Sequence, residues 1–569
     1  MDERSQFRRL LQSFSYRFLD NELLSAEGDA RQTAVHALAL IGAFSITLCL
    51  CFRYKYSLML FGMSEARRDA ISWGDKELLI SLAMAVTGFL SIVTWDGLFP
   101  DRRDCLTLHA LPIRKRTIFA AKLTAVLVMF GVVTLALNAP TTLLFPWLVL
   151  GDKAPIGALA GSVLAHAVAL CGASAFLFFA FLTLQGLLVA LLPFRQYKWI
   201  SSWVQMGSLF AILSLFFLMP DVARPDSLAD PRNSLTIHLL PPFWFLGLYE
   251  ELMGARLPIV HELANMARAG LAASIVTALA AYAVGYNRYV RKTIEEADAI
   301  SADRTTRAGL LSRLADRLLV RQPIERAVFH FAARTMARNR KHRLLLAIYA
   351  GVGFSYVLKS VAWVFQGHAE RMYRLDPSIS SVPLILSFFV LLGMRVLFTV
   401  PVELNSNWIF RLTENGRPSE YLAGARKLMI AVGIAPLTLG TFPIYGFLWG
   451  WGYAARHLLL VSLILLLVLE YLMRGFPKIP FTCSFLPGKL NLKATIGIYA
   501  VLFLMFALAV TAIELALLRA RSGYWIGAGL IALGLLYRAW RRNAWERKLK
   551  GFVYEERPDW AMARLDLQP

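Results

Sequence analysis

The chain has little charge and little cysteine for its length. Of its 569 residues, 17% are Asp, Glu, Lys or Arg and 57% are hydrophobic, whereas a soluble domain has about 25% charged residues. This composition excludes a cytosolic enzyme, a disordered chain and a collagen-like chain. The five cysteines have no metal-ligand spacing and form no recognisable disulfide framework.

Motifs for nucleotide binding and catalysis are also missing. The phosphate-binding pattern G-x-x-x-x-G-K-[ST] does not occur, because Gly488-Lys489 has Cys483 in place of the first glycine and is followed by Leu490. His261-Glu262 lacks the second histidine of a zinc-protease motif. We therefore expect no enzyme activity, no metal and no cofactor in this chain.

Long apolar runs are what the sequence has instead. A hydrocarbon core about 30 Å thick needs about 20 apolar residues per helix. Twelve runs approach or exceed that length: 34–52, 78–99, 121–149, 156–193, 200–219, 267–290, 344–365, 382–403, 427–449, 456–473, 494–518 and 522–540. The fourth run is expected to be one long helix that can break near Gly186. The predicted fold class is an all-α polytopic membrane protein with about 12 transmembrane helices.

The basic residues indicate which way these helices run. Lys and Arg outnumber Asp and Glu by 60 to 38, and 43 of the 60 lie in segments on the same side as the N-terminus. Because positive charge favours the cytoplasmic side, we expect a multi-pass protein of the cell (inner) membrane with both termini in the cytoplasm. Contact of basic loops with anionic lipid headgroups accounts for the net charge without nucleic acid.

The two halves of the chain are similar to one another. The second span ends at Trp95-Asp96 and the chain re-enters at Ala121-Lys122; the eighth ends at Val402-Glu403 and the chain re-enters at Arg426-Lys427. Lys122 and Lys427 are 305 residues apart. Both halves begin on the same side with an even number of spans, so we predict two parallel six-helix repeats.

A basic, amphipathic stretch precedes the first span of each half, at 7–19 and 324–336. Apolar residues at i, i+3 and i+4 with arginines between them favour a helix that lies flat in the membrane interface. The predicted domains are a first six-helix half at 1–292, a cytoplasmic linker at 293–321, a second six-helix half at 322–545 and a cytoplasmic tail at 546–569.

The cytoplasmic connections after the second and eighth spans have a distinctive composition. In the first, Leu108 and Leu111-Pro112-Ile113 precede Arg114-Lys115-Arg116, a pattern typical of an apolar turn, a proline break and the start of a basic helix. The second has Arg411 and Arg417-Pro418. Each segment is either a short coupling helix that seats in another subunit or an ordinary solvated loop.

This arrangement resembles the ABC-2 type permease family, the membrane subunits of ATP-binding-cassette exporters. The residues that match the family pattern L-x-x-L-P-I-x-x-R-x-I-x-x-A-K are Leu108, Leu111, Pro112, Ile113, Arg116, Ile118, Ala121 and Lys122. The segment Leu240–Glu250 between spans five and six is also similar to the family. The second half has Asn415-Gly416-Arg417-Pro418 in place of Leu-Pro-Ile.

The resemblance implies a permease that exports an unidentified substrate, with ATP and Mg²⁺ bound by a separate ATPase subunit. Two halves fused in one chain then replace a permease dimer, with membrane lipid as a further partner. The residues implied in coupling to the ATPase are Leu108, Leu111, Pro112, Ile113, Arg114, Lys115, Arg116, Lys122, Arg411, Arg417, Pro418 and Lys427.

Charged residues within the spans are candidates for intramembrane polar sites. Asp96 and Glu403 occupy matching places near the inner ends of their spans. A functional role and a structural ion pair are equal alternatives for both residues. Lys359 has the length to snorkel outward, whereas Arg395 needs a buried partner or a polar cavity.

Two further acidic residues near span ends are expected to form local ion pairs. Glu470 lies one helical turn before Arg474, and Glu514 lies shortly before Arg519 and Arg521. Residues four apart on a helix face one another, so we predict that Glu470 pairs with Arg474 and Glu514 with one of the other two arginines.

The longest outer connection, 220–266, turns from polar to aromatic at Pro242-Phe243-Trp244. The resemblance implies re-entrant helices that close the outer mouth, with these three residues in an outer gate; an aromatic anchor in the interface is the alternative.

Two other functions remain open. One is a 12-helix secondary transporter driven by an ion gradient. The other is a membrane enzyme that works from segment 220–266, whose candidate acid–base groups are Asp221, Asp226, Glu250, Glu251, His261 and Glu262.

Overall fold

A computed structural model of the chain describes most of its residues. Those described are 3–295 apart from 20–29, 61, 99–107, 109–110, 112, 152–153 and 220–221, and 316–552 apart from 318, 366–375, 401–409, 411, 413, 415–417, 475, 477, 483–502, 504, 508, 512, 515, 517–520 and 549–551. The chain divides into two compact units, Met1–Ala302 and Asp303–Pro569. The boundary between them falls within the predicted linker 293–321.

The described residues form helices and contain no strand, which confirms the all-α class. Within this part of the chain, nine helices are long and apolar enough to cross a membrane. They are Arg67–Val93, Lys115–Leu150, Ile156–Leu191, Trp199–Phe217, Pro258–Tyr286, Arg340–Ala362, Pro377–Leu397, Pro418–Trp449 and Trp451–Leu472. Helices α2 (Ala30–Tyr54) and α22 (Arg521–Lys548) cover the predicted runs 34–52 and 522–540, whereas run 494–518 lies mostly outside the described residues.

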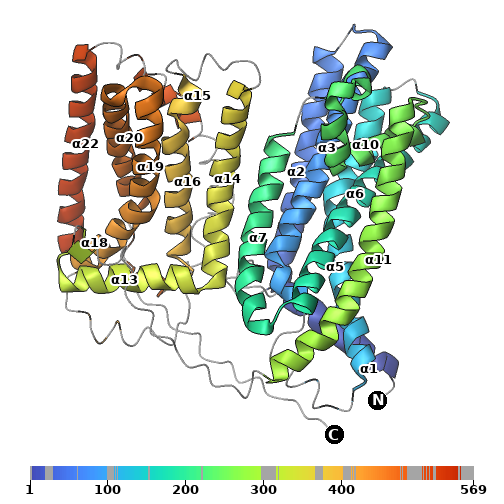
Figure 1. The fold of residues 1–569 in the computed structure, drawn as a ribbon, viewed down its shortest axis with the longest axis horizontal. Helices are drawn as coiled ribbons and strands as arrows, with labels where there is room; N and C mark the ends of the chain where they lie inside the picture. The colour runs from blue at the N-terminus through green and yellow to red at the C-terminus, as the bar shows by residue number, and fades with distance from the viewer. Residues whose placement is uncertain are drawn as a thin grey trace. The chain divides into compact units, whose positions relative to one another are not determined.

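The first unit is a bundle organised around one long helix (Figure 1). Its elements are α1 (Glu3–Leu19), α2 (Ala30–Tyr54), η1 (Lys55–Met59), α3 (Glu65–Val93), η2 (Trp95–Leu98), α5 (Lys115–Leu150), α6 (Ile156–Leu191), α7 (Phe194–Phe217), α8 (Pro225–Ala229), η3 (Pro231–Asn233), α9 (Ser234–Leu239), α10 (Pro241–Leu252) and α11 (Pro258–Glu295). Helix α6 contacts α3, α5, α10 and α11, so it forms the centre of the unit.

Helix α6 continues without interruption through Gly186, which confirms the prediction of one long helix; the possible break at this residue does not form. Glycine has a different role here. A Cβ atom on Gly186 would lie 2.8 Å from the carbonyl carbon of Ala281 in α11. The missing side chain allows α6 and α11 to approach closely, as small residues do at helix contacts in membranes.

The second unit has fewer described elements. They are α13 (Pro323–Arg338), α14 (Arg340–Phe365), α15 (Pro377–Ser380), α16 (Val382–Leu397), α18 (Pro418–Met429), η6 (Ile430–Ile434), α19 (Ala435–Trp449), α20 (Trp451–Leu472) and α22 (Arg521–Lys548). Helix α16 contacts α14, α19 and α20, and its buried residues Phe388, Leu391 and Leu397 form part of the core.

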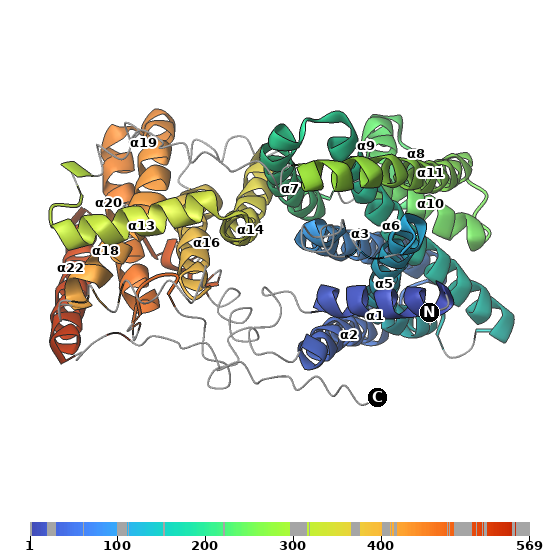
Figure 2. The same cartoon turned by 90° about the horizontal axis from the view of Figure 1, so that it is seen from below.

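Both predicted amphipathic stretches are helices that pack against the beginning of a later span. Helix α1 contacts α5, and α13 contacts α18 (Figure 2). In Figure 1, α13 runs across the ends of the long helices of its unit. Its buried residues Val328, Ala332 and Met336 recur every four residues and face this bundle.

Candidate functional site

Helix α1 packs against the beginning of α5 at one end of the first unit. We call this contact the elbow of the first unit. Leu10 and Phe14 of α1 are buried in one cluster with Ile118 of α5. Arg114 Nη1 and Thr117 Oγ1 both donate hydrogen bonds to the Glu3 carboxylate, each at 3.1 Å. These contacts fix α1 against the first turn of the span that follows the predicted coupling segment.

Lys122 is also part of this elbow. Its side chain is buried, with Nζ 5.0 Å from the centre of the Phe14 ring. A cation over an aromatic ring is stabilised by the ring quadrupole. Lys122 is therefore buried against α1 of its own unit. A residue that contacts a partner would have to lie on the surface instead.

The other predicted coupling residues of the first unit differ in exposure. Leu108 and Ile113 are half-buried and pack against the α1–α5 cluster. Leu111 is 50% exposed. Arg114 is exposed, as are the two residues that follow it, Lys115 and Arg116. Lys115 and Arg116 form the first turn of α5 itself, and Pro112 lies outside the described residues.

The second unit has an elbow with its own ion pairs. Lys427 of α18 pairs with Glu325 of α13. The neighbouring Arg426 Nη1 lies 2.7 Å from Glu546 Oε1 of α22, and both side chains are buried. A Cβ atom on Gly424 would lie 2.7 Å from the carbonyl oxygen of Glu325, so α13 and α18 are in close contact there.

Pro418 begins α18 and is buried. Proline suits the first turn of a helix because that position needs no backbone N–H donor. Arg411, Arg417 and Glu403 lie outside the described residues. The backbone of Asp96 belongs to η2, but its side chain is not described.

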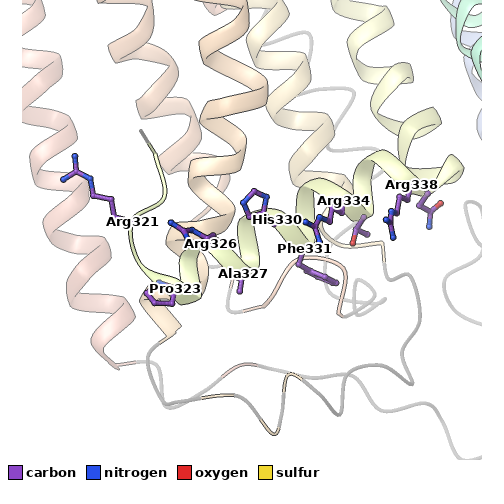
Figure 3. Close-up of a pocket in the computed structure, with 10 residues that line it drawn as sticks. Arg321, Pro323, Arg326, Ala327, His330, Phe331, Arg334 and Arg338 are labelled. Atoms are coloured by element: carbon purple, nitrogen blue, oxygen red, sulfur yellow. The ribbon is translucent and has the colours of Figure 1, made fainter. Parts of the chain in front are cut away.

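A basic groove of about 950 Å³ runs along α13 (Figure 3). Arg326, His330, Arg334 and Arg338 line it at intervals of four residues, so they form one stripe on the helix. This stripe lies on the side of α13 opposite the buried residues Val328, Ala332 and Met336.

Charge along the groove is only partly neutralised. Asp316 lies 2.6 Å from His330 Nε2 and 3.5 Å from Arg326 Nε. Among the described residues, no carboxylate pairs with Arg334 or Arg338. The groove therefore has an excess of positive charge, which sequence patterning alone did not single out.

Within the spans, Arg395 and Lys359 lie in different surroundings. Arg395 Nε donates to the carbonyl oxygen of Leu472 at 2.8 Å, and its guanidinium lies 4.4 Å from the centre of the Phe476 ring. Lys359 is exposed on α14.

The predicted ion pair between Glu470 and Arg474 does not form, because Glu470 pairs with Arg542 of α22. Its partner lies on a neighbouring helix, and sequence spacing carries no information about such a contact. Glu514 Oε1 lies 2.7 Å from His457 Nδ1 of α20, with both side chains buried. Arg519 and the side chain of Arg521 lie outside the described residues, so the pairing of Glu514 with one of these arginines stays a prediction.

The predicted outer connection of the first unit, 220–266, contains the short helices α8, α9 and α10. Phe243 is fully buried, Pro242 and Trp244 are half-buried, and the Trp244 indole donates to the carbonyl oxygen of His238 at 2.9 Å. Helix α10 contacts α3, α6 and α11. The aromatic residues therefore pack α10 into the bundle.

Two titratable pairs tie α9 and α10 to α11. The pKa of His238 is raised mainly by its hydrogen bond to the Ser234 carbonyl and also by its hydrogen bond to Glu262. A hydrogen bond from Arg268, at 2.8 Å, lowers the pKa of Glu251, which also contacts His261. Glu251, His261 and Glu262 belong to the set considered for acid–base chemistry, and here they take part in contacts between helices.

A buried ion pair in the first unit was missed by sequence reasoning. Lys76 Nζ of α3 lies 2.7 Å from Glu250 Oε1 of α10, and each side chain is 4% exposed. Lys76 also lies 4.9 Å from the centre of the Tyr249 ring. The sequence places both charges in outer loops, and only the position of Glu250 at the end of an aromatic run hints at burial.

Next to this pair lies a buried histidine. His166 of α6 is fully buried, with its ring 5.7 Å from that of Tyr249. Neither ring nitrogen has a hydrogen-bond partner among the described residues. Buried polar atoms without partners are uncommon, and intramembrane ionisable groups often mark functional sites.

No metal site is formed by the described residues. Comparison with known proteins finds no match to a family model, to a curated protein or to a solved structure.

Proposed function

We propose that this chain is the membrane-spanning permease subunit of an ATP-binding-cassette exporter, with two permease halves in one polypeptide. One observation carries the proposal. In each unit a carboxylate of an amphipathic helix binds the beginning of a later span. In the first unit Glu3 of α1 binds Arg114 and Thr117, and in the second unit Glu325 of α13 binds Lys427. A duplicated unit accounts for this recurrence.

The elbows are suited to transmit force from a separate motor. Helix α1 is rigidly packed on α5, and exposed Arg114, Lys115 and Arg116 stand beside it. In the second unit the basic groove of α13 offers Arg334 and Arg338. A partner with an acidic surface is attracted to such sites, because complementary charge speeds association and fixes orientation.

In this proposal both termini are cytoplasmic and the protein lies in the inner membrane. ATP and Mg²⁺ bind to the ATPase subunit, and membrane lipid surrounds the permease. Closure of the ATPase moves the elbows, and the helix bundles transmit this movement to the outer helices α9 and α10. The transported substrate is left unassigned.

The proposal is tested by purifying the tagged chain from its native membranes in mild detergent. We expect an ATP-binding-cassette ATPase to co-purify. Reversal of Arg114, Lys115 and Arg116 to glutamate should reduce its recovery severalfold, whereas Arg232→Glu, an exposed change in the outer connection, should leave it unchanged. Recovery that is equal for both variants contradicts coupling through the elbow.

A secondary transporter is the second candidate, and the Lys76–Glu250 pair with neighbouring His166 favours it. Buried ionisable groups form proton relays in many such proteins. Proton movement in ATP-free vesicles that is lost in Glu250→Gln would support this alternative over the exporter.

A further inference from the structure

The basic groove of α13 is lined by arginines that have no carboxylate partner among the described residues. These are Arg321, Arg334 and Arg338, and all three are exposed (Figure 3). Asp316 contacts the groove, but its single charge is shared by Arg326 and His330. The positive charge of the other three arginines is therefore left for an occupant of the groove.

The orientation of α13 limits what this occupant can be. The arginine stripe lies opposite the buried residues Val328, Ala332 and Met336, so it faces away from the bundle. Helix α13 itself runs across the ends of the long helices (Figure 1). The groove is thus open to water beyond the helix ends, which favours an acidic polypeptide segment over the acyl chain of a lipid.

The chain has such a segment directly after the described residues of this unit. Residues 553–569 contain two arginines and four acidic residues, Glu555, Glu556, Asp559 and Asp566. The whole chain has the opposite balance, with 60 Lys and Arg to 38 Asp and Glu. This segment is therefore a local source of negative charge in a basic protein.

Phe552, the last described residue, holds the beginning of the acidic segment close to the groove. Its backbone N–H donates to Glu414 Oε1 at 2.9 Å, and its ring centre lies 5.4 Å from that of Tyr421 in α18. Glu414 follows Phe410 by four residues, and the Phe410 ring centre lies 5.0 Å from that of Phe331 in the groove. The acidic segment therefore starts beside α13.

The acidic residues are within reach of the arginines. An extended chain spans about 3.3 Å per residue, so Asp559 can lie up to about 23 Å from Phe552. Helix α13 has 16 residues and is about 24 Å long. Exposed ion pairs are weak singly, but a tethered segment has an effective concentration of about 1 mM. A few weak pairs therefore hold it in place.

We propose that the acidic segment 555–566 docks in the basic groove of α13, where its carboxylates accept hydrogen bonds from Arg321, Arg334 and Arg338. Arginine binds a carboxylate through two parallel N–H donors. The docked segment covers arginines that the proposed function offers to an ATPase, so it competes with that partner. Only this competition rests on the proposed function; the docking does not.

The test uses the full-length chain purified in detergent, with no other protein present. A photoreactive amino acid replaces Ala327, which lines the groove, is exposed and carries no charge. After irradiation and digestion, mass spectrometry locates the adduct along the chain. We expect the adduct to lie within residues 553–569 of the same molecule.

Charge reversal shows whether the arginines hold the segment. Reversal of Arg334 and Arg338 to glutamate should lower the yield of the adduct severalfold, because attraction is replaced by repulsion. Reversal of Arg541 and Arg547 is the matched control, since these arginines of α22 are exposed and do not line the groove. The control should leave the yield unchanged, and size-exclusion chromatography checks that both variants fold.

Glu555→Arg with Glu556→Arg, added to the reversed groove, should restore the adduct and so separates charge pairing from loss of folding. Equal yields in the groove variant and the control overturn the proposal. An adduct in segment 293–315, or one that joins two copies of the chain, also overturns it. Because no ATPase is present, the outcome is independent of the proposed function.

Discussion

At the scale of single residues, the buried charges of the two units join parts of the chain that are far apart in sequence. Lys76 and Glu250 are 174 positions apart, Glu470 and Arg542 are 72 apart, and His457 and Glu514 are 57 apart. Sequence spacing predicts contacts along one helix but not between helices. The sequence therefore identified charged residues as candidates and assigned the wrong partner to Glu470, which pairs with Arg542.

Lys76→Met should be strongly destabilising, because it leaves the buried Glu250 carboxylate without its ion-pair partner. The expected loss is about 3–5 kcal/mol in the free energy of unfolding. Arg114→Met is a matched control, since Arg114 pairs with Glu3 at 3.1 Å but the two side chains are 79% and 53% exposed, and should cost less than about 1 kcal/mol. Thermal unfolding in detergent measures both. Equal shifts in the two variants would show that burial of the Lys76 pair has no energetic consequence.

The stability of the contact between α9 and α11 should depend weakly on pH through His238. Its pKa is raised in the folded protein by the Ser234 carbonyl and Glu262. The stabilisation is therefore complete below the unfolded pKa of about 6.5 and is lost as pH rises through the folded pKa. Glu262 is 59% exposed, so the effect should stay below about 0.5 kcal/mol.

The measurement compares thermal unfolding of the unchanged chain and His238→Gln at about pH 5.5 and about pH 8.5. The variant should unfold at a lower temperature at the acidic pH and at the same temperature at the alkaline pH. A difference confined to alkaline pH would contradict the assigned sign.

At the scale of elements, apolar runs predicted the helices well and their details less well. The runs at 121–149 and 156–193 correspond to α5 and α6, since a run of such length has few alternatives to a membrane helix. The prediction of one long helix over 156–193 is confirmed, and the possible break at Gly186 does not form, because a glycine's role depends on the neighbouring helix. The packing of α10 into the bundle depends on contacts with α3, α6 and α11, which no local pattern specifies.

Gly186→Ala tests the close contact between α6 and α11. The new Cβ would meet the backbone of Ala281, so the helices must separate, at a cost of about 1–3 kcal/mol. Gly161 lies on the same helix, and a Cβ atom there would have no other atom within 4 Å. Gly161→Ala should therefore leave the stability unchanged or raise it slightly. Thermal unfolding temperatures in detergent should fall for the first variant only; a fall of the same size in both would indicate that helix packing at Gly186 is not limiting.

At the scale of the whole molecule, the chain consists of two units that each have their own core. Cluster residues Phe243 and Leu263 belong to the first, and Phe388 and Leu465 to the second. The similarity of segments around Lys122 and Lys427 led to the prediction of a repeat. Helices α1 and α13 were predictable from amphipathic patterning. The basic groove was not, because it depends on where α13 and Asp316 lie in the folded unit.

Cutting the chain between residues 302 and 303 should leave both halves stably inserted when they are expressed together. Each half retains its buried cluster, so its helices have the partners they need. Resistance of both fragments to extraction by alkaline carbonate measures insertion. Degradation of both fragments, with the intact chain stable, would contradict independent cores.

The most direct measurement for the account as a whole is photo-crosslinking in living cells from one elbow position and one position distant from it. A photoreactive amino acid replaces Arg116, exposed beside α1, or Ile156, which is 86% exposed at the beginning of α6. We predict that the adduct from position 116 contains an ATP-binding-cassette ATPase and that the adduct from position 156 does not. The same ATPase captured equally from both positions, or from neither, would contradict an elbow driven by a separate motor.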